Sequence, residues 1–189
     1  MTRTRPAQER RADLLAAGRE LFLAKGIAAT SLDDITRAAG MSKGLFYLYF
    51  RAKDDLVLAL RDEFAAAAAT RIRAAAAAET AWPAKLDACV QACFSYHREL
   101  HDLHDVLFHH TPHEHAQERL GPVAQAIYDI LAAGKAAGAF DLEDPELTAV
   151  LCYASLHAFD PDFHSGGRRP DGPLVRAAQQ LFRRAAGVE

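Results

Sequence analysis

The sequence lacks the features that mark secreted and membrane-spanning proteins. Its three cysteines are an odd number in a chain of 189 residues, which does not suit a framework of paired disulfides. No apolar run approaches the ~20 residues that a membrane-spanning helix needs. The N-terminus is basic but leads into an amphipathic segment, unlike the apolar core of a signal peptide. These absences predict a cytoplasmic protein.

Catalytic motifs are also missing. The sequence shows no glycine-rich phosphate loop, no nucleophile elbow and no His-Glu-x-x-His pair. We therefore expect no enzymatic activity and no cofactor.

Runs of alternating Val, Ile and Thr, which would indicate strands, are absent, and helix-forming alanine is abundant instead. Half of the residues are hydrophobic, and alanine forms runs at 65–69 and 74–78. The composition predicts an all-α fold of about nine helices. We expect them near residues 6–25, 32–39, 43–50, 53–78, 83–103, 105–110, 113–137, 145–159 and 173–186.

The charge is unevenly distributed along the chain. Residues 1–53 hold ten Lys or Arg and five Asp or Glu, a charge of +5, which leaves −8 on the rest of a chain whose net charge is −3. A basic first part and an acidic remainder predict that only the first part meets a polyanion.

Two short helices joined by Ala39-Gly40-Met41 predict a helix-turn-helix. Thr30 and Ser31 can cap the first of these helices, with acidic residues in capping-box position three residues later. In the second helix Phe46 and Phe50 are four residues apart, so they share one face, which we assign to the core. Lys43 and Tyr47 form another such pair and point elsewhere, as a helix that reads a DNA groove requires.

The segment 30–56, TSLDDITRAAGMSKGLFYLYFRAKDDL, strongly resembles the TetR/AcrR family of regulators. The shared pattern is Ala39-Gly40, Ser42-Lys43-Gly44, Tyr47-Leu48-Tyr49-Phe50 and Lys53-Asp54-Asp55-Leu56, in the correct order. With the first helix, the match covers about a quarter of the chain, and beyond Leu56 only the helical layout and length agree.

The resemblance implies an N-terminal three-helix DNA-binding domain over 1–53 and a larger helical ligand-binding and dimerisation domain over 54–189. It also implies the residues that contact operator DNA: Thr30, Ser31, Ser42, Lys43, Gly44, Leu45, Tyr47, Tyr49 and Lys53. Two positions depart from the family pattern. Leu45 stands where a small polar residue is frequent, and Leu48 where an aromatic or polar one is frequent. One interpretation of Leu45 is contact with a thymine methyl group.

In the resembled family the last two helices pair with their twins into a four-helix dimer interface. Two-fold symmetry also suits a palindromic DNA site, because one recognition helix reads few bases. The interface residues expected here are Leu147, Val150, Leu151, Ala154, Leu174, Ala178, Leu181 and Phe182.

The second part of the chain holds a face of cysteine and histidine. Cys89, Cys93, His97 and His101 are spaced four residues apart, which places them along one side of a helix. Thiolate and imidazole suit a metal such as zinc, but a metal about 2 Å from each ligand reaches only two neighbouring positions of such a row. The alternatives are a lining for an effector, formed by Cys89, Cys93, His97, Phe108 and His157, a thiol or pH sensor, and ordinary core.

The sequence thus predicts a homodimeric transcriptional regulator, a repressor released from its operator by a small molecule. One alternative keeps DNA binding but makes the signal a metal or thiol oxidation at Cys89, Cys93 and His97. A second alternative is a helical binding or catalytic domain without DNA recognition. The sequence names neither the effector nor the operator.

Overall fold

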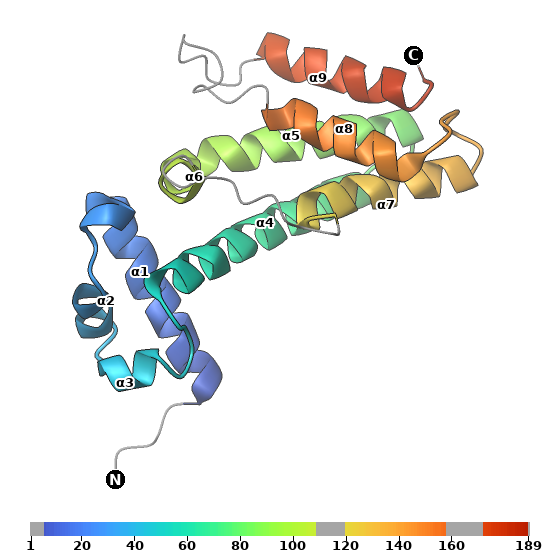
Figure 1. Ribbon diagram of the computed structural model, residues 1–189. Coiled ribbons are helices and arrows are strands. Elements are labelled where there is room, and N and C mark those ends of the chain that lie inside the picture. The colour runs from blue at the N-terminus through green and yellow to red at the C-terminus, as the bar shows by residue number, and fades with distance from the viewer. Residues whose placement is uncertain (1–5, 109–119, 158–171, 189) are drawn as a thin grey trace. The chain divides into compact units, whose positions relative to one another are not determined.

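The fold is built of α-helices throughout the parts of the chain that the computed structural model describes, residues 6–108, 120–157 and 172–188 (Figure 1). The all-α prediction is therefore confirmed. The helices in these ranges are α1 (Ala7–Ala29), α2 (Leu32–Ala38), α3 (Lys43–Phe46), α4 (Lys53–Ala77), α5 (Trp82–Glu99), α6 (His101–Phe108), α7 (Pro122–Ala136), α8 (Pro145–His157) and α9 (Gly172–Ala185). Within the same ranges no helix is long and apolar enough to cross a membrane.

Two predicted boundaries are wrong. The helix expected over 43–50 ends at Phe46, and the chain continues in a turn, because Tyr49 and Phe50 both donate their N–H to the Phe46 carbonyl. The helix expected to reach residue 103 ends at Glu99, and a separate α6 begins at His101. The first part of the helix predicted from residue 113 lies outside the described residues.

The chain divides into two compact units. The first contains residues 6–64 and 100–108, and the second contains 65–99, 120–157 and 172–188, among the residues described. The first unit extends past the domain boundary predicted at residue 53, because the early turns of α4 and the buried Leu107 of α6 belong to the same apolar core as α1. The assignment of functions to the two parts stays a prediction.

The core of the first unit forms where α1 and α4 approach closely and α2 and α3 lie beside α1 (Figure 1). Gly18 makes the close approach possible, because a Cβ atom there would lie 2.5 Å from a methyl carbon of Leu56. Gly26, with φ of 80°, interrupts α1 at the position where the sequence predicted its end. Buried residues from all four helices complete this core: Leu14, Leu15, Phe22, Ile35, Phe46, Leu56 and Leu60.

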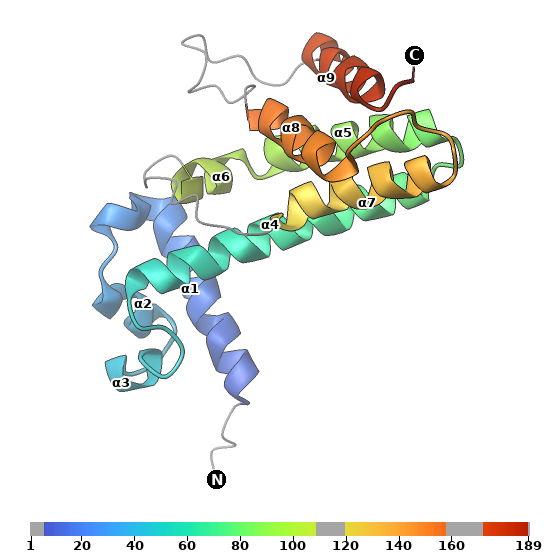
Figure 2. The same ribbon diagram turned by 45° about the vertical axis from the view of Figure 1, so that its right-hand side comes forward.

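The second unit is a helical layer in which α8 packs against α7, and α9 packs against both α5 and α8 (Figure 2). Its fully buried side chains include Leu86, Ile127, Leu131, Ala178 and Phe182. A salt bridge joins two of these helices: the Arg183 guanidinium donates through both Nε and Nη2 to the Asp87 carboxylate. Gln179 adds a bond to the Asp87 carbonyl, so α9 is held on α5 by polar contacts as well as by its apolar face.

The contact of Gly134 in α7 with Phe140 yields a stability prediction. A Cβ at residue 134 would lie 2.1 Å and 2.2 Å from two carbons of the buried Phe140 ring. Gly134→Ala should therefore lower the free energy of unfolding by about 1–3 kcal/mol, measured by urea denaturation, although glycine-to-alanine changes inside helices usually stabilise. The control is the same change in a Phe140→Ala background, where it should cost nothing. An equal cost in both backgrounds would contradict the steric explanation.

Candidate nucleic-acid interface

Hydroxyl groups cap both short helices of the helix-turn-helix. The Ser31 Oγ accepts a bond from the Asp34 N–H at 3.2 Å, and the Asp34 carboxylate accepts one from the Ser31 N–H at 3.0 Å. This reciprocal capping box starts α2, as the sequence predicted. The Ser42 Oγ accepts from the Leu45 N–H at 3.3 Å and starts α3. Gly40, with φ of 64°, makes the turn between the two helices.

Two aromatic side chains fix α3 and the turn that follows it. Phe46 is fully buried and Phe50 nearly so, and their ring centroids lie 5.5 Å apart. The prediction that both belong to the core is confirmed. Because they face inward, Tyr47 and Leu48 between them remain exposed, with 56% and 76% of their surfaces accessible.

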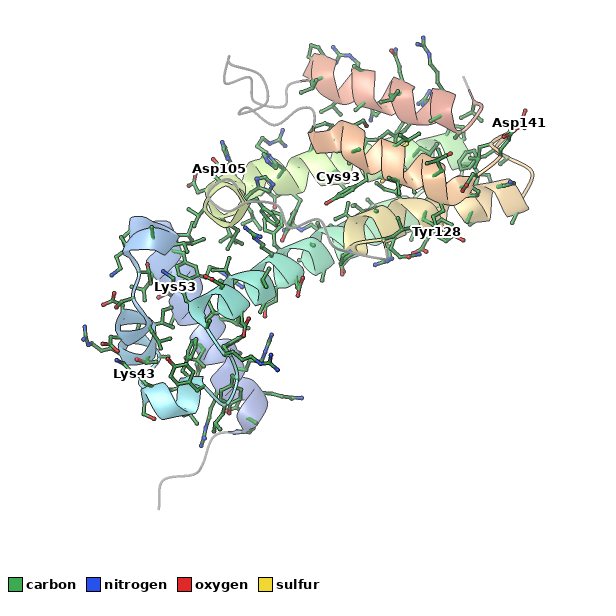
Figure 3. All side chains as sticks on the ribbon, in the orientation of Figure 1. Lys43, Lys53, Cys93, Asp105, Tyr128 and Asp141 are labelled. Carbon is green, nitrogen blue, oxygen red and sulfur yellow. The ribbon has the colours of Figure 1, made fainter. Side chains whose placement is uncertain are left out.

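Most of the predicted DNA contacts lie on the surface of the first unit. Ser31, Ser42, Lys43, Gly44 and Tyr47 are exposed, while Leu45, Tyr49 and Lys53 are partly buried. Lys43 lies where α2 and α3 meet, as labelled in Figure 3. The structure thus brings together Ser42 to Tyr47 on one short segment, and their contact with DNA stays a prediction.

Thr30 does not fit the predicted role. Only 1% of its surface is accessible. Its hydroxyl donates to the Gly26 carbonyl at 2.7 Å and also lies 3.4 Å from the Leu21 carbonyl oxygen. The prediction that Thr30 contacts a phosphate is therefore wrong for this structure, since the side chain is buried and already bonded inside the protein.

Lys53 has a structural role that sequence reasoning missed. Its ammonium donates to the Ile27 carbonyl at 2.6 Å and to the Thr30 carbonyl at 2.8 Å. These bonds join the start of α4, where Figure 3 labels Lys53, to the last turn of α1 and the residue that follows it. Two of the three N–H groups of the ammonium are used in this way, which leaves one N–H group for a phosphate. The motif that contains Lys53 does not indicate these bonds, because the two carbonyls lie 26 and 23 residues earlier in the chain.

Acidic residues of α2 pair with the basic residues around them. The Lys43 ammonium lies 2.6 Å from an Asp33 carboxylate oxygen, and this hydrogen bond raises the pKa of Lys43. The Lys25 ammonium lies 2.7 Å from Asp34, and its hydrogen bond, with those from Ser31, holds the pKa of Asp34 well below its usual range. Lys43 must therefore exchange a carboxylate for a phosphate if it binds DNA.

The residues predicted to form an interface between two copies are partly exposed and partly buried within their own chain. Leu147, Val150, Leu151, Ala154 and Leu181 are exposed, and Leu174 is half-buried. Ala178 and Phe182 are fully buried in the core of their own unit. Their assignment to a dimer interface is wrong, because the face of α9 that carries them packs inward.

The residues predicted to line an effector site do not converge. Cys89 is fully buried in the second unit, Cys93 and His97 are partly buried there, and Phe108 belongs to the first unit. Phe108 stacks on His104 with ring centroids 4.9 Å apart. His157 ends α8, but its side chain lies outside the described residues.

The thiol and metal alternatives find little support in the described residues. The hydrogen bond with Cys93 and burial raise the pKa of the Cys89 thiol, and burial raises the pKa of Cys152 to about 12. Protonated thiols are poor nucleophiles and poor metal ligands. Within the described ranges no three His, Cys, Asp or Glu side chains are grouped to hold a metal ion. His101, the last residue of the predicted row, instead lies 2.9 Å from an Asp105 carboxylate oxygen.

Comparison with known proteins finds relatives of the helix-turn-helix region. A family model described as "Bacterial regulatory proteins, tetR family" matches residues 14–60, which contain the helix-turn-helix. The regulator TtgR of Pseudomonas putida is 43% identical over 56 residues, which cover 30% of this chain and 27% of that protein. The helix-turn-helix part of the chain therefore resembles the DNA-binding part of TetR-family regulators.

Solved structures show a similar fold over nearly the whole chain. A tetR-family regulatory protein from Rhodococcus RHA1 is 27% identical, with a TM-score of 0.62 over 98% of this chain and 100% of that one. FadR from Bacillus subtilis, solved in complex with stearoyl-CoA, has a TM-score of 0.66 at 19% identity over 94% and 99% of the two chains. By contrast, the part of the chain that matches TtgR spans about a quarter of the length of that protein.

The position of Lys53 yields a prediction that separates stability from DNA binding. Lys53→Met should lower the free energy of unfolding by about 1.5–3 kcal/mol, because two carbonyls lose a charged donor. Urea denaturation of the DNA-free protein measures it. The matched control is Lys43→Met, which removes an exposed ion pair and should destabilise the protein less than Lys53→Met does. Equal stability of the Lys53→Met variant and the unmodified protein would show that the two carbonyl bonds contribute nothing.

Proposed function

We propose that the protein is a homodimeric transcriptional regulator that binds a palindromic operator through α2 and α3 of each copy. The observation that carries the proposal is the set of exposed residues between Ser42 and Leu48, which the buried Phe46 and Phe50 hold in place, within the region that matches the tetR-family model. A rigid, exposed segment of this size suits a major groove about 12 Å wide. This activity would place the protein in the cytoplasm.

The proposed action is repression that a small molecule relieves. The effector binds the second, acidic part of the chain and favours a state of the dimer that binds DNA less well, and DNA disfavours the effector by the same factor. Known relatives support the proposal in outline: FadR of Bacillus subtilis was solved with stearoyl-CoA and RolR with resorcinol. FasR of Mycolicibacterium smegmatis, 34% identical over 91 residues, is an activator. A reporter assay must therefore decide whether this protein represses or activates transcription.

DNA binding is tested by gel shift with the DNA upstream of the gene that encodes this chain. Specific binding should weaken steeply as the salt concentration rises, because counterions are released from the phosphates that the protein contacts. Lys43→Met should weaken binding and reduce the slope of log K against log salt by about 0.9 for each phosphate that the variant leaves unneutralised. Lys135→Met, a change of the same kind at an exposed residue of α7, is the control. Binding that neither variant changes would contradict the assignment of Lys43.

Dimerisation is proposed to cover the exposed apolar side chains of α8 and α9. Leu147, Val150 and Leu151 have 56%, 41% and 62% of their surfaces accessible. Full burial of such a side chain contributes about 1.5–3 kcal/mol. Together with Leu181 they form the surface that two copies are expected to share.

The dimer prediction concerns Leu151. Leu151→Glu should convert the protein to monomers in sedimentation experiments, since it places a carboxylate opposite its twin in an apolar interface. It should also abolish operator binding, because one recognition segment reads too few bases. Leu23→Glu changes a leucine of α1 that is 45% accessible and should leave the dimer intact. Dimers of undiminished affinity in the Leu151→Glu variant would contradict the proposed surface.

A further inference from the structure

We infer that Leu48 is a base-reading residue: its side chain contacts the C5-methyl group of a thymine in each half-site of the operator. The inference rests on the proposed function and adds to it the residue and the base that set part of the specificity.

Leu48 is more exposed than any other large hydrophobic side chain in the described parts of the chain, with 76% of its surface accessible. A single exposed leucine is common on protein surfaces and does not by itself indicate a contact. What distinguishes Leu48 is its position, directly after α3 and beside the exposed Tyr47.

The backbone holds Leu48 outward. Its N–H donates to the Leu45 carbonyl at 3.2 Å, and the N–H groups of Tyr49 and Phe50 both donate to the Phe46 carbonyl, at 2.9 and 3.0 Å. The buried rings of Phe46 and Phe50 lie on either side of it in the sequence. The turn therefore cannot rotate Leu48 into the core without exposing a phenylalanine to water, which the hydrophobic effect opposes.

The surroundings of Leu48 favour nucleic acid as the occupant. Residues 1–53 carry a charge of +5, and the same short segment exposes Lys43 and Tyr47. Leucine has no hydrogen-bonding side chain, so it gains nothing from a phosphate or from the polar edge of guanine, adenine or cytosine. Thymine is the base that presents an apolar group in the major groove, its C5-methyl. A leucine in this position therefore selects thymine.

The expected effect follows from the size of one methyl group. Its burial against Leu48 should improve affinity by about 4-fold per half-site, and by about 15-fold when both half-sites of a symmetric operator are changed. The effect resides in the thymine methyl, so deoxyuridine, which lacks only this methyl and pairs in the same way, is the discriminating probe.

The test begins by selecting bound duplexes from DNA with a random central block, using the full-length protein. Each thymine of the selected duplex is then replaced singly by deoxyuridine, and symmetric pairs are replaced together. In the unmodified protein one symmetric pair should weaken binding by about 15-fold. In Leu48→Ala the same replacement should have no effect, and selection with this variant should lose the preference for thymine at that position.

Two controls keep the outcome decisive. Leu58→Ala removes a leucine of α4 with 52% of its surface accessible and should respond to deoxyuridine as the unmodified protein does. Leu45→Ala tests the neighbouring leucine, and thymine dependence that disappears there but persists in Leu48→Ala would overturn the inference. An effect of deoxyuridine that is equal in all variants would also overturn the inference. The same holds if DNA-free Leu48→Ala sediments differently from the unmodified protein while its thymine dependence is unchanged. Failure to select any sequence would instead overturn the proposed DNA binding.

Discussion

The burial of Phe46 and Phe50 is the constraint on which the candidate DNA surface depends. α3 has four residues, and a helix of that length has no stability of its own because the cost of its first turn is not recovered. Its position is therefore set by what it buries, and the two rings lie 5.5 Å apart in the core of the first unit. Tyr47 and Leu48 are exposed because their neighbours are not. The same short sequence thus supplies both the buried rings of the core and the exposed side chains of the candidate DNA surface.

Polar groups next to this surface are largely occupied within the protein. The hydroxyls of Thr30, Ser31 and Ser42 and the ammonium of Lys53 all bond to main-chain or side-chain partners. These bonds hold the helix-turn-helix in one arrangement before any DNA is present, which reduces the ordering that binding must cost. They also leave fewer polar side chains to distinguish bases. An apolar side chain that contacts a base, as proposed for Leu48, suits a surface whose polar groups are already bonded within the protein.

The sequence predicted the elements that depend on local chemistry, and it failed where distant residues decide. The capping box at Ser31, the glycine break at Gly26 and the inward face of Phe46 all follow from spacing within one or two turns. The structural role of Lys53 was missed because its bonds to carbonyls far back in the chain leave no trace in its own motif. Ala178 and Phe182 were placed on the wrong side of α9, because an amphipathic stripe does not reveal whether its own chain or a second copy covers it.

The cysteines illustrate the same limit. In the sequence, Cys89 and Cys93 suggest a reactive row of thiols. In the fold, Cys89 and Cys152 are buried among apolar side chains, and the pKa of each thiol is raised, since burial disfavours the thiolate and the hydrogen bond with Cys93 holds Cys89 protonated. A sensor cysteine needs the opposite environment, a stabilised thiolate that solvent can reach. Cys89 and Cys152 therefore lie in surroundings that disfavour a thiol sensor at these two positions.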